Sequence, residues 1–280
     1  MSVDSTAPDG WEEGFVEANG IELHYRRTGG EGPPFVISHG FTDDGDCRIA
    51  LARGLEDDFD VVLYDARGHG RSDAPDEAYG AAERATDLLG LLDALDIEDP
   101  ILFGHSMGAD TVTAAAARQP DRPRAVVLED PVWRVEGSDG VDGGTQDEGP
   151  GRDLAEQIAQ WQESSVEEVF ETEAWLGELA ESGQPELANR LARARRRLRP
   201  EVTRVFEAGL LDHAEANEDI EAPTLVLKAD ADGVVRERER AMADQFPDGR
   251  IVHVEDAGHT VFYDERERAT EHLRAFLATV

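Results

Sequence analysis

The chain has 280 residues, enough to bury a full core as one domain or as one domain with an insertion. It carries 62 acidic residues against 27 basic ones, a formal net charge of −35, which excludes nucleic acids and anionic membranes as partners. Its single cysteine, Cys47, excludes an internal disulfide and any cysteine-based metal cluster. Hydrophobic residues still make up 40% of the chain, so a globular fold is expected.

Only one of the basic residues is a lysine, Lys228, and all the others are arginines. A surface this acidic resembles those of halophilic proteins, where carboxylates keep the protein hydrated and a Debye length of about 3 Å at 1 M salt screens their repulsion. The near-absence of lysine favours this interpretation over an ordinary acidic protein. Residues 1–10 are polar and acidic, unlike a signal peptide, and no apolar run reaches the roughly 20 residues of a membrane helix. We therefore expect a cytoplasmic protein.

The first predicted element is a β-hairpin over residues 14–27, where two alternating runs flank Asn19-Gly20. The next apolar runs are continuous, which is typical of strands covered on both faces of a parallel sheet. These runs are 35–37, 61–64, 101–103, 125–128, 224–227 and 250–252. Helical patterns lie between them, at 81–95, 106–118, 236–245 and 260–278. The alternation predicts an α/β fold, with a mostly parallel central sheet and helices on both faces.

The alternation of strands and helices stops between Pro131 and Ala222. Amphipathic patterns in this interval predict helices and no strand, at about 152–163, 165–181, 185–198 and 201–215. We interpret residues 132–221 as a helical lid inserted after the sixth strand. Residues 11–131 and 222–280 then form the core domain, and residues 1–10 form a flexible N-terminal tail.

Four motifs follow predicted strands. Ser106 stands in a G-x-S-x-G sequence between an apolar run and an Ala-rich helical run; its glycines prevent collisions in a tight turn that exposes the serine hydroxyl. The others are H-G-F at 39–41, D-A-R-G-H-G-R-S at 65–72 and D-A-G-H at 256–259. Because ligands bind outside the carboxyl ends of the strands in open α/β sheets, we expect these motifs to converge on one crevice.

In this order, the motifs resemble those of the α/β-hydrolase family, in the lidded branch that includes esterases, carbon–carbon bond hydrolases and enol-lactonases. The resemblance extends from about residue 14 to residue 280. It implies that Ser106 is the nucleophile and His259 its base, with the backbone N–H groups of Phe41 and Met107 forming the oxyanion hole. Family members that cleave epoxides or haloalkanes use aspartate as nucleophile, so a serine favours acyl transfer to water.

The acid that orients His259 has more than one candidate. The resemblance places it in a G-x-x-D loop after the seventh strand, where residues 229–232 read A-D-A-D. Asp232 therefore occupies the acid position, with Asp230 as a neighbouring competitor. Asp130, at the end of the sixth strand, is the alternative acid, because some members carry it there.

Three further residues, His39, His105 and Trp133, are candidates to line the substrate pocket. The arginine-rich stretch at 193–199 is the main basic cluster, and we interpret it as a solvated helix face that balances neighbouring carboxylates. Capture of an anionic substrate is the alternative. No metal-ligand spacing and no dinucleotide-binding fingerprint is present, so we expect neither a metal nor a cofactor.

The sequence thus predicts a cofactor-free serine hydrolase that cleaves a small or medium carboxylic ester or lactone. One alternative is a carbon–carbon bond hydrolase of a dienoic keto acid, in which an arginine would bind the substrate carboxylate. A second alternative is a non-catalytic relative that binds a small ligand. The last is disfavoured because the serine, the histidine and candidate acids are all present.

Overall fold

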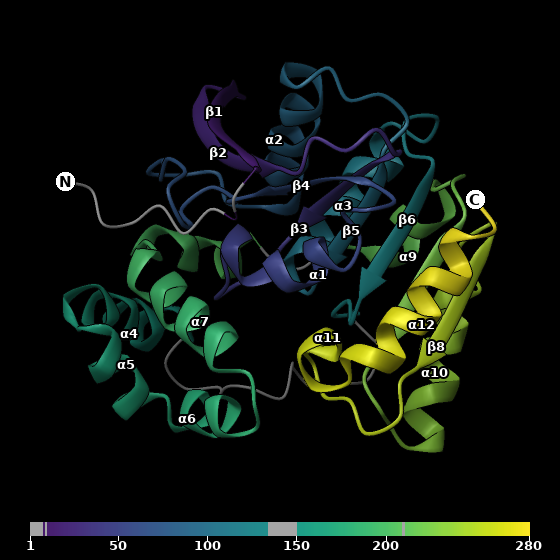
Figure 1. Cartoon of the computed structure of the whole chain (residues 1–280). Helices are drawn as coiled ribbons and strands as arrows, with labels where there is room; N and C mark the ends of the chain where they lie inside the picture. Colours follow the sequence, from purple (N-terminus) through teal and green to yellow (C-terminus); the bar gives the residue numbers. More distant parts are fainter. Residues whose placement is uncertain (1–7, 9, 134–149, 209–210) are drawn as a thin grey trace.

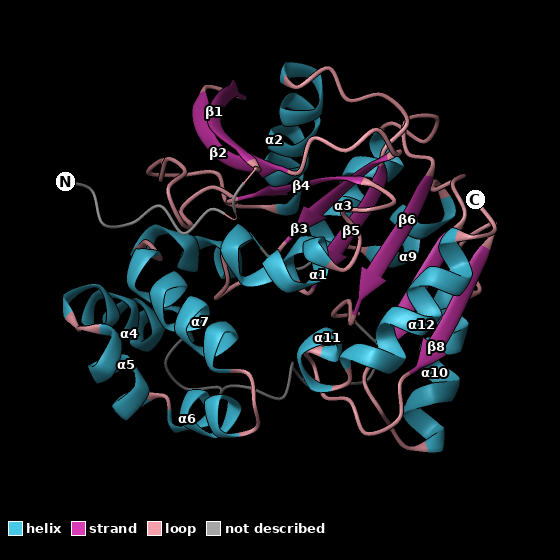
Figure 2. Cartoon of the chain, viewed as in Figure 1, coloured by secondary structure: helices cyan, strands magenta, loops and turns pink. Residues whose placement is uncertain are grey.

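A computed structural model describes residues 8, 10–133, 150–208 and 211–280, and an eight-stranded sheet runs through it (Figures 1 and 2). The strand order is β1-β2-β4-β3-β5-β6-β7-β8. The strands are β1 (Glu12–Ala18), β2 (Ile21–Arg27), β3 (Pro34–Ser38), β4 (Asp60–Tyr64), β5 (Ile101–His105), β6 (Ala125–Glu129), β7 (Thr224–Lys228) and β8 (Gly249–His253).

The predicted hairpin forms the antiparallel edge of this sheet. β1 pairs with β2 in register from Glu12↔Arg27 to Ala18↔Ile21, and β2 then pairs antiparallel with β4. Asn19 and Gly20 both have positive φ, at 52° and 77°, as the tight turn between two twisted strands requires. All pairings from β4 to β8 are parallel, so the carboxyl ends of these strands meet at one edge.

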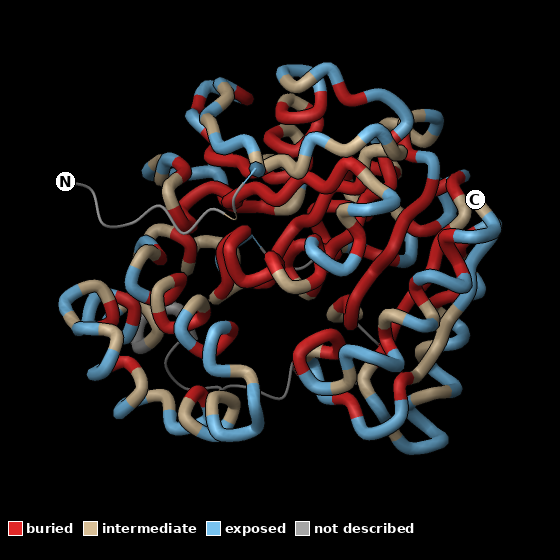
Figure 3. Tube along the Cα trace, viewed as in Figure 1, coloured by how far each residue is buried: buried red, intermediate tan, exposed pale blue. Residues whose placement is uncertain are grey.

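Helices cover both faces of the sheet, which confirms the predicted α/β fold (Figure 1). Side chains of α2 and α3 pack with one apolar core, and side chains of α1 and α12 pack with the other. The inner strands β3 to β7 are almost entirely buried, which explains their continuous apolar runs, whereas the edge strands β1 and β8 are partly exposed (Figure 3). The helices of the core are η1 (Gly45–Arg48), α1 (Ile49–Arg53), α2 (Ala81–Ala94), α3 (Met107–Arg118), α10 (Gly233–Ala243), α11 (Val261–Asp264) and α12 (Arg266–Leu277).

The described residues between β6 and β7 contain helices and no strand. They are α4 (Pro150–Glu163), α5 (Val166–Thr172), α6 (Ala174–Glu181), α7 (Pro185–Arg197), η2 (Pro200–Arg204), α8 (Val205–Ala208) and α9 (His213–Glu218). Helices α4 to α7 gather to one side of the sheet (Figure 1). Their apolar faces form a third core, which also takes in Cys47, Tyr79 and Tyr263 from the sheet-bearing part.

The division into core, lid and tail stays a prediction. Residues 134–149 of the predicted lid, and most of the predicted tail at 1–10, lie outside the described residues. Among the residues described, no helix has the length and apolarity to cross a bilayer.

Candidate active site

Ser106 lies in a strained turn between β5 and α3. Its φ and ψ are 50° and −114°, a conformation that non-glycine residues rarely adopt. Both flanking positions require glycine, because other backbone segments lie too close to leave room for a side chain. A Cβ at Gly104 would lie 2.3 Å from the Gly108 carbonyl oxygen, and a Cβ at Gly108 would lie 2.2 Å from that of Ser38. The turn therefore holds the hydroxyl at the carboxyl edge of the sheet.

Two hydrogen bonds connect Ser106 to a carboxylate through His259. The His259 Nε2 atom is 2.9 Å from Ser106 Oγ, and its Nδ1 atom is 2.6 Å from Asp130 Oδ2. Asp130 follows β6, while His259 stands in the loop between β8 and α11. The carboxyl ends of β5, β6 and β8 thus bring together residues that are up to 153 positions apart in the sequence.

Asp130 is held from its other side by Lys228, the last residue of β7. The Lys228 Nζ atom is 2.7 Å from Asp130 Oδ1, 3.0 Å from Glu239 Oε1 and 3.0 Å from the Pro131 carbonyl oxygen. Burial raises the pKa of Asp130, but the hydrogen bond with His259 and the charge of Lys228 outweigh it and lower that pKa to about 2. The carboxylate is therefore ionised throughout the neutral range.

The first-choice acid of the sequence analysis, Asp232, has a different position. It is the N-cap residue of α10, and its Oδ1 atom accepts hydrogen bonds from the backbone N–H groups of Val234 and Val235 at 2.9 and 3.0 Å. Asp230 is engaged by Arg236 and by the backbone N–H of Asp256. The carboxylate that contacts His259 in the structure belongs to Asp130, the alternative acid of the sequence analysis.

The two residues predicted for the oxyanion hole, Phe41 and Met107, follow the ends of the paired strands β3 and β5. Met107 is the first residue of α3, where the backbone N–H groups have no partner within the helix. Phe41 follows the end of β3, and its carbonyl oxygen lies 2.7 Å from His69 Nε2. Gly40 allows this turn to approach β5, because a Cβ there would lie 2.5 Å from His105 Nδ1.

Two of the residues predicted to line the pocket, His39 and His105, make hydrogen bonds within the protein. His39 is fully buried; its Nε2 atom accepts a hydrogen bond from Ala66 N–H at 3.0 Å, so its Nδ1–H donates to the Gly40 carbonyl oxygen at 2.8 Å. Burial lowers the pKa of His39 and keeps the ring neutral. His105 places its Nε2 atom 3.0 Å from the His259 carbonyl oxygen, and the two rings lie 5.0 Å apart. Both histidines therefore support loops of the site.

Trp133, the third of these candidates, is partly buried and lies beside Lys228, whose Nζ atom is 5.4 Å from its ring centroid. Its indole N–H is buried without a hydrogen-bond partner among the described residues. The structure therefore places Trp133 next to the Asp130–Lys228 pair.

The arginine-rich stretch is not a uniformly solvated helix face. Arg197 Nη1 is 3.3 Å from Asp44 Oδ2 and 3.4 Å from Asp46 Oδ2, joining α7 to the loop and helix after β3. Arg195 is only 5% exposed and packs against Trp161 and Trp175, with its Nη2 atom 3.4 Å from Thr42 Oγ1. Its Nε atom is buried and has no hydrogen-bond partner in the described parts of the chain.

Two charged residues at this site were missed by the sequence analysis, Lys228 and the fully buried Glu129. Lys228 could have been noticed because it is the only lysine in the sequence and directly follows the predicted strand at 224–227. In the structure it ends β7, which pairs with β6. Glu129 precedes Asp130, and a carboxylate closing the apolar run at 125–128 is unusual for a strand covered on both faces. Within the described ranges, no cluster of side chains could hold a metal ion.

Comparison with known proteins decides the family. A sequence model described as "alpha/beta hydrolase fold" matches residues 33–266. The chain belongs to the α/β-hydrolase family. It is 30% identical over 264 residues to an N-formylmaleamate deformylase of Pseudomonas putida, which covers 90% of this chain and 91% of the relative.

Solved structures of α/β-hydrolases superpose over nearly all of the chain. A thermophilic esterase from Thermogutta terrifontis, solved with malate bound, has 26% identity and a TM-score of 0.72, covering 96% of this chain and 98% of its own. An enol-lactonase from Burkholderia xenovorans has 24% identity and the same TM-score of 0.72, covering 95% of this chain and 100% of its own. These relatives are hydrolases of small molecules, which supports a hydrolase activity for this α/β-hydrolase.

Proposed function

We propose that this α/β-hydrolase is a serine hydrolase that cleaves a small or medium carboxylic ester or lactone through an acyl-enzyme. The observation that carries the proposal is the hydrogen-bonded series Ser106–His259–Asp130, at 2.9 and 2.6 Å. A serine hydroxyl is a weak nucleophile unless a neighbouring base takes its proton, and this geometry provides both the base and the group that orients it.

In the proposed mechanism, Ser106 Oγ attacks the substrate carbonyl carbon while His259 Nε2 takes its proton. Asp130 accepts the hydrogen bond from Nδ1–H, which fixes the tautomer and stabilises the imidazolium. The backbone N–H groups of Met107 and Phe41 stabilise the oxyanion, each contributing about 3 kcal/mol to lowering the barrier. His259 then protonates the leaving group and activates the water that hydrolyses the acyl-enzyme.

We also propose that residues 132–221 act as a lid over this site and help select the substrate. Support comes from the contact of α7 with the segment that follows β3, through Arg195–Thr42 and Arg197–Asp44. This segment contains the predicted oxyanion residue Phe41, so α7 lies beside the position expected for the substrate. Lids diverge more than the scaffold in such folds, and the physiological ester depends on the lid's shape.

A second candidate function is cleavage of an N-acyl bond in a small carboxylic acid. It is favoured by the similarity to a deformylase of an amide acid over 90% of the chain. It is also favoured by Arg195, whose buried guanidinium has an Nε–H without a partner among the described residues and could pair with a substrate carboxylate.

A substrate panel tests these proposals. It contains p-nitrophenyl esters of increasing acyl length, a lactone, an N-formyl amide acid and a dienoic keto acid, each assayed in molar salt. Ester or lactone turnover that disappears in Ser106→Ala supports the main proposal, and preferential turnover of the amide acid supports the second. Turnover that persists in Ser106→Ala contradicts both proposals. Turnover of the keto acid alone also contradicts both. Labelling by a fluorophosphonate, which requires an activated serine, separates an enzyme from a non-catalytic relative.

A further inference from the structure

We propose that Glu129 and Arg48 form a positioning pair that holds the Ser106, His259 and Asp130 elements in register; this proposal rests on the proposed function above. Glu129 and Arg48 are both fully buried, and Arg48 Nη1 donates to Glu129 Oε2 at 2.7 Å. Neither residue takes part in the mechanism as derived from the Ser106–His259–Asp130 series.

Glu129 is connected to all three elements of the site. Its backbone carbonyl oxygen accepts the Ser106 N–H at 3.0 Å. Its Oε1 atom accepts the backbone N–H of Phe262 at 2.9 Å, which anchors the loop that carries His259 three residues earlier. It also directly precedes Asp130, whose backbone has a positive φ of 41°. A displacement of the Glu129 side chain would therefore move the His259 loop relative to Ser106 and Asp130.

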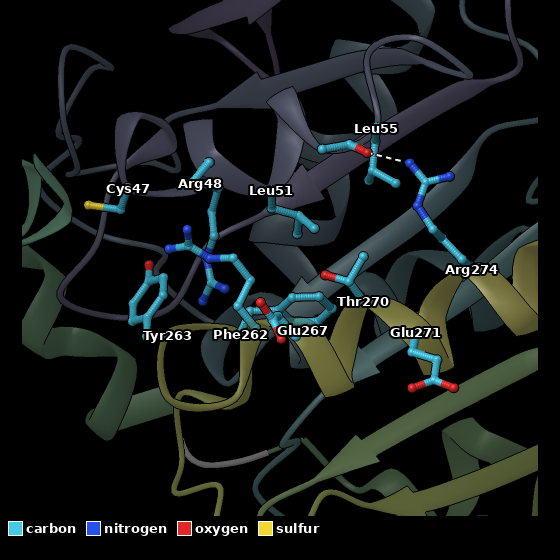
Figure 4. Close-up of a pocket in the computed structure, with 13 residues that line it drawn as sticks. Cys47, Arg48, Leu51, Leu55, Phe262, Tyr263, Glu267, Thr270, Glu271 and Arg274 are labelled. Atoms are coloured by element: carbon cyan, nitrogen blue, oxygen red, sulfur yellow. Dashed lines mark hydrogen bonds between the residues drawn. The ribbon is translucent and has the colours of Figure 1, made fainter. Parts of the chain in front are cut away.

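Arg48 fixes the carboxylate of Glu129 from the opposite side. Its guanidinium carbon lies 4.5 Å from the Tyr263 ring centroid, and Tyr263 Oη donates to Asp43 Oδ2 at 2.7 Å. Arg48, Phe262 and Tyr263 meet at one end of a pocket of about 450 Å³ between α1 and α12 (Figure 4). The His259 loop is thus held by polar contacts in addition to the packing of the buried Phe262 in an apolar core.

An interpretation based on stability alone explains this pair poorly. Two charges buried away from water lose hydration, and replacing such a pair with apolar residues of similar volume is often neutral or stabilising. The contact that apolar residues cannot reproduce is the acceptor for Phe262 N–H. We therefore expect turnover to depend on the Glu129 oxygen that accepts from Phe262 N–H. The charges of Arg48 and Glu129 should not affect turnover.

Two double variants make this separation. Arg48→Met/Glu129→Gln keeps a side-chain oxygen for Phe262 N–H, whereas Arg48→Met/Glu129→Leu removes both the charges and the acceptor. We expect kcat near the wild-type value for the Gln variant and a fall of about 100-fold for the Leu variant, the effect of a misplacement near 1 Å. KM should change little in both, because substrate contacts are preserved. Thermal unfolding is measured alongside, to show that both variants are folded.

The matched control is Arg27→Met/Asp60→Leu at the opposite edge of the sheet. Asp60 likewise accepts from a guanidinium, Arg27 Nε at 2.7 Å, and from a backbone N–H, that of Gly29 at 3.0 Å. This control should change the melting temperature without a selective loss of kcat. If the Leu variant does not fold, Arg48→Met/Glu129→Met replaces it, since methionine adapts to irregular sites.

The proposal is overturned if the folded Leu or Met variant turns over as fast as the Gln variant, or if the Gln variant loses kcat as severely. It is also overturned if the Arg27/Asp60 control loses kcat to the same degree. Failure of the proposed function has a different signature, namely turnover by the Ser106→Ala variant or no fluorophosphonate labelling of the wild-type protein.

Discussion

The choice between Asp130 and Asp232 leads to a paired prediction at the acid. In Asp130→Asn, the amide NH₂ would donate to His259 Nδ1 across the 2.6 Å contact, placing the ring proton on Nε2. A ring protonated on Nε2 cannot accept the Ser106 proton. Loss of the acid through such a tautomer change lowers kcat by about 10⁴-fold, or about 5.5 kcal/mol of activation free energy.

Asp232→Asn is the matched control. Asparagine is as good an N-cap as aspartate, so the hydrogen bonds to Val234 and Val235 should persist. We therefore expect stability and kcat close to those of the wild-type protein. The assay is turnover of the best ester from the panel, together with the rate of fluorophosphonate labelling, which reports the activation of Ser106 without the later hydrolysis step.

The opposite pattern would refute the assignment. If Asp232→Asn abolished turnover while Asp130→Asn kept it, the acid would lie in the loop after β7, and the contact between Asp130 and His259 would be incidental. Equal and partial losses in both variants would mean that neither carboxylate alone orients the ring.

Three further predictions concern the support of the site and the surface. Lys228→Met should lower the free energy of unfolding by about 3 kcal/mol in a denaturant titration, because Asp130 and Glu239 lose their shared cation; unchanged stability would contradict this. Gly104→Ala should destabilise the protein by about 1–3 kcal/mol and lower kcat, since its Cβ would collide with a backbone carbonyl, and a fully active, equally stable variant would count against the tight turn. With 62 acidic residues, the protein should melt at a higher temperature in molar KCl than in dilute buffer, and full stability in dilute buffer would argue against salt adaptation.

Much of the fold could be predicted because local signals agreed with the tertiary structure. Asn19-Gly20 fixed the hairpin turn, and continuous apolar runs indicated strands buried on both faces. The prediction of one helix over 260–278 differs from the structure, which has a short α11 and then α12, separated at Glu265. Asp264 accepts a hydrogen bond from Gly258 N–H and folds α11 back toward the His259 loop. The sequence periodicity could not reveal this contact, because it depends on a loop's tertiary position.

The sequence placed the candidate residues at the carboxyl ends of strands, but it did not show which carboxylate contacts His259. Asp130 and Asp232 both follow strands whose carboxyl ends face one crevice, so sequence position alone does not separate them. The separation comes from tertiary geometry. Asp232 precedes a helix and satisfies its first N–H groups, whereas Asp130 adopts a positive φ that turns its side chain toward His259 and Lys228.

The low pKa of Asp130 links the site to stability at acid pH. The pKa falls from 3.8 to about 2 in the folded protein, a shift that corresponds to stabilisation on the order of 2 kcal/mol. Because the folded value is the lower one, this contribution is complete above about pH 4 and disappears as the pH falls through about 2. The difference in unfolding free energy between wild type and Asp130→Asn should therefore be constant near neutrality and shrink below pH 4. A difference that does not change between pH 6 and pH 2 would show that the ionised carboxylate is not stabilised by His259 and Lys228.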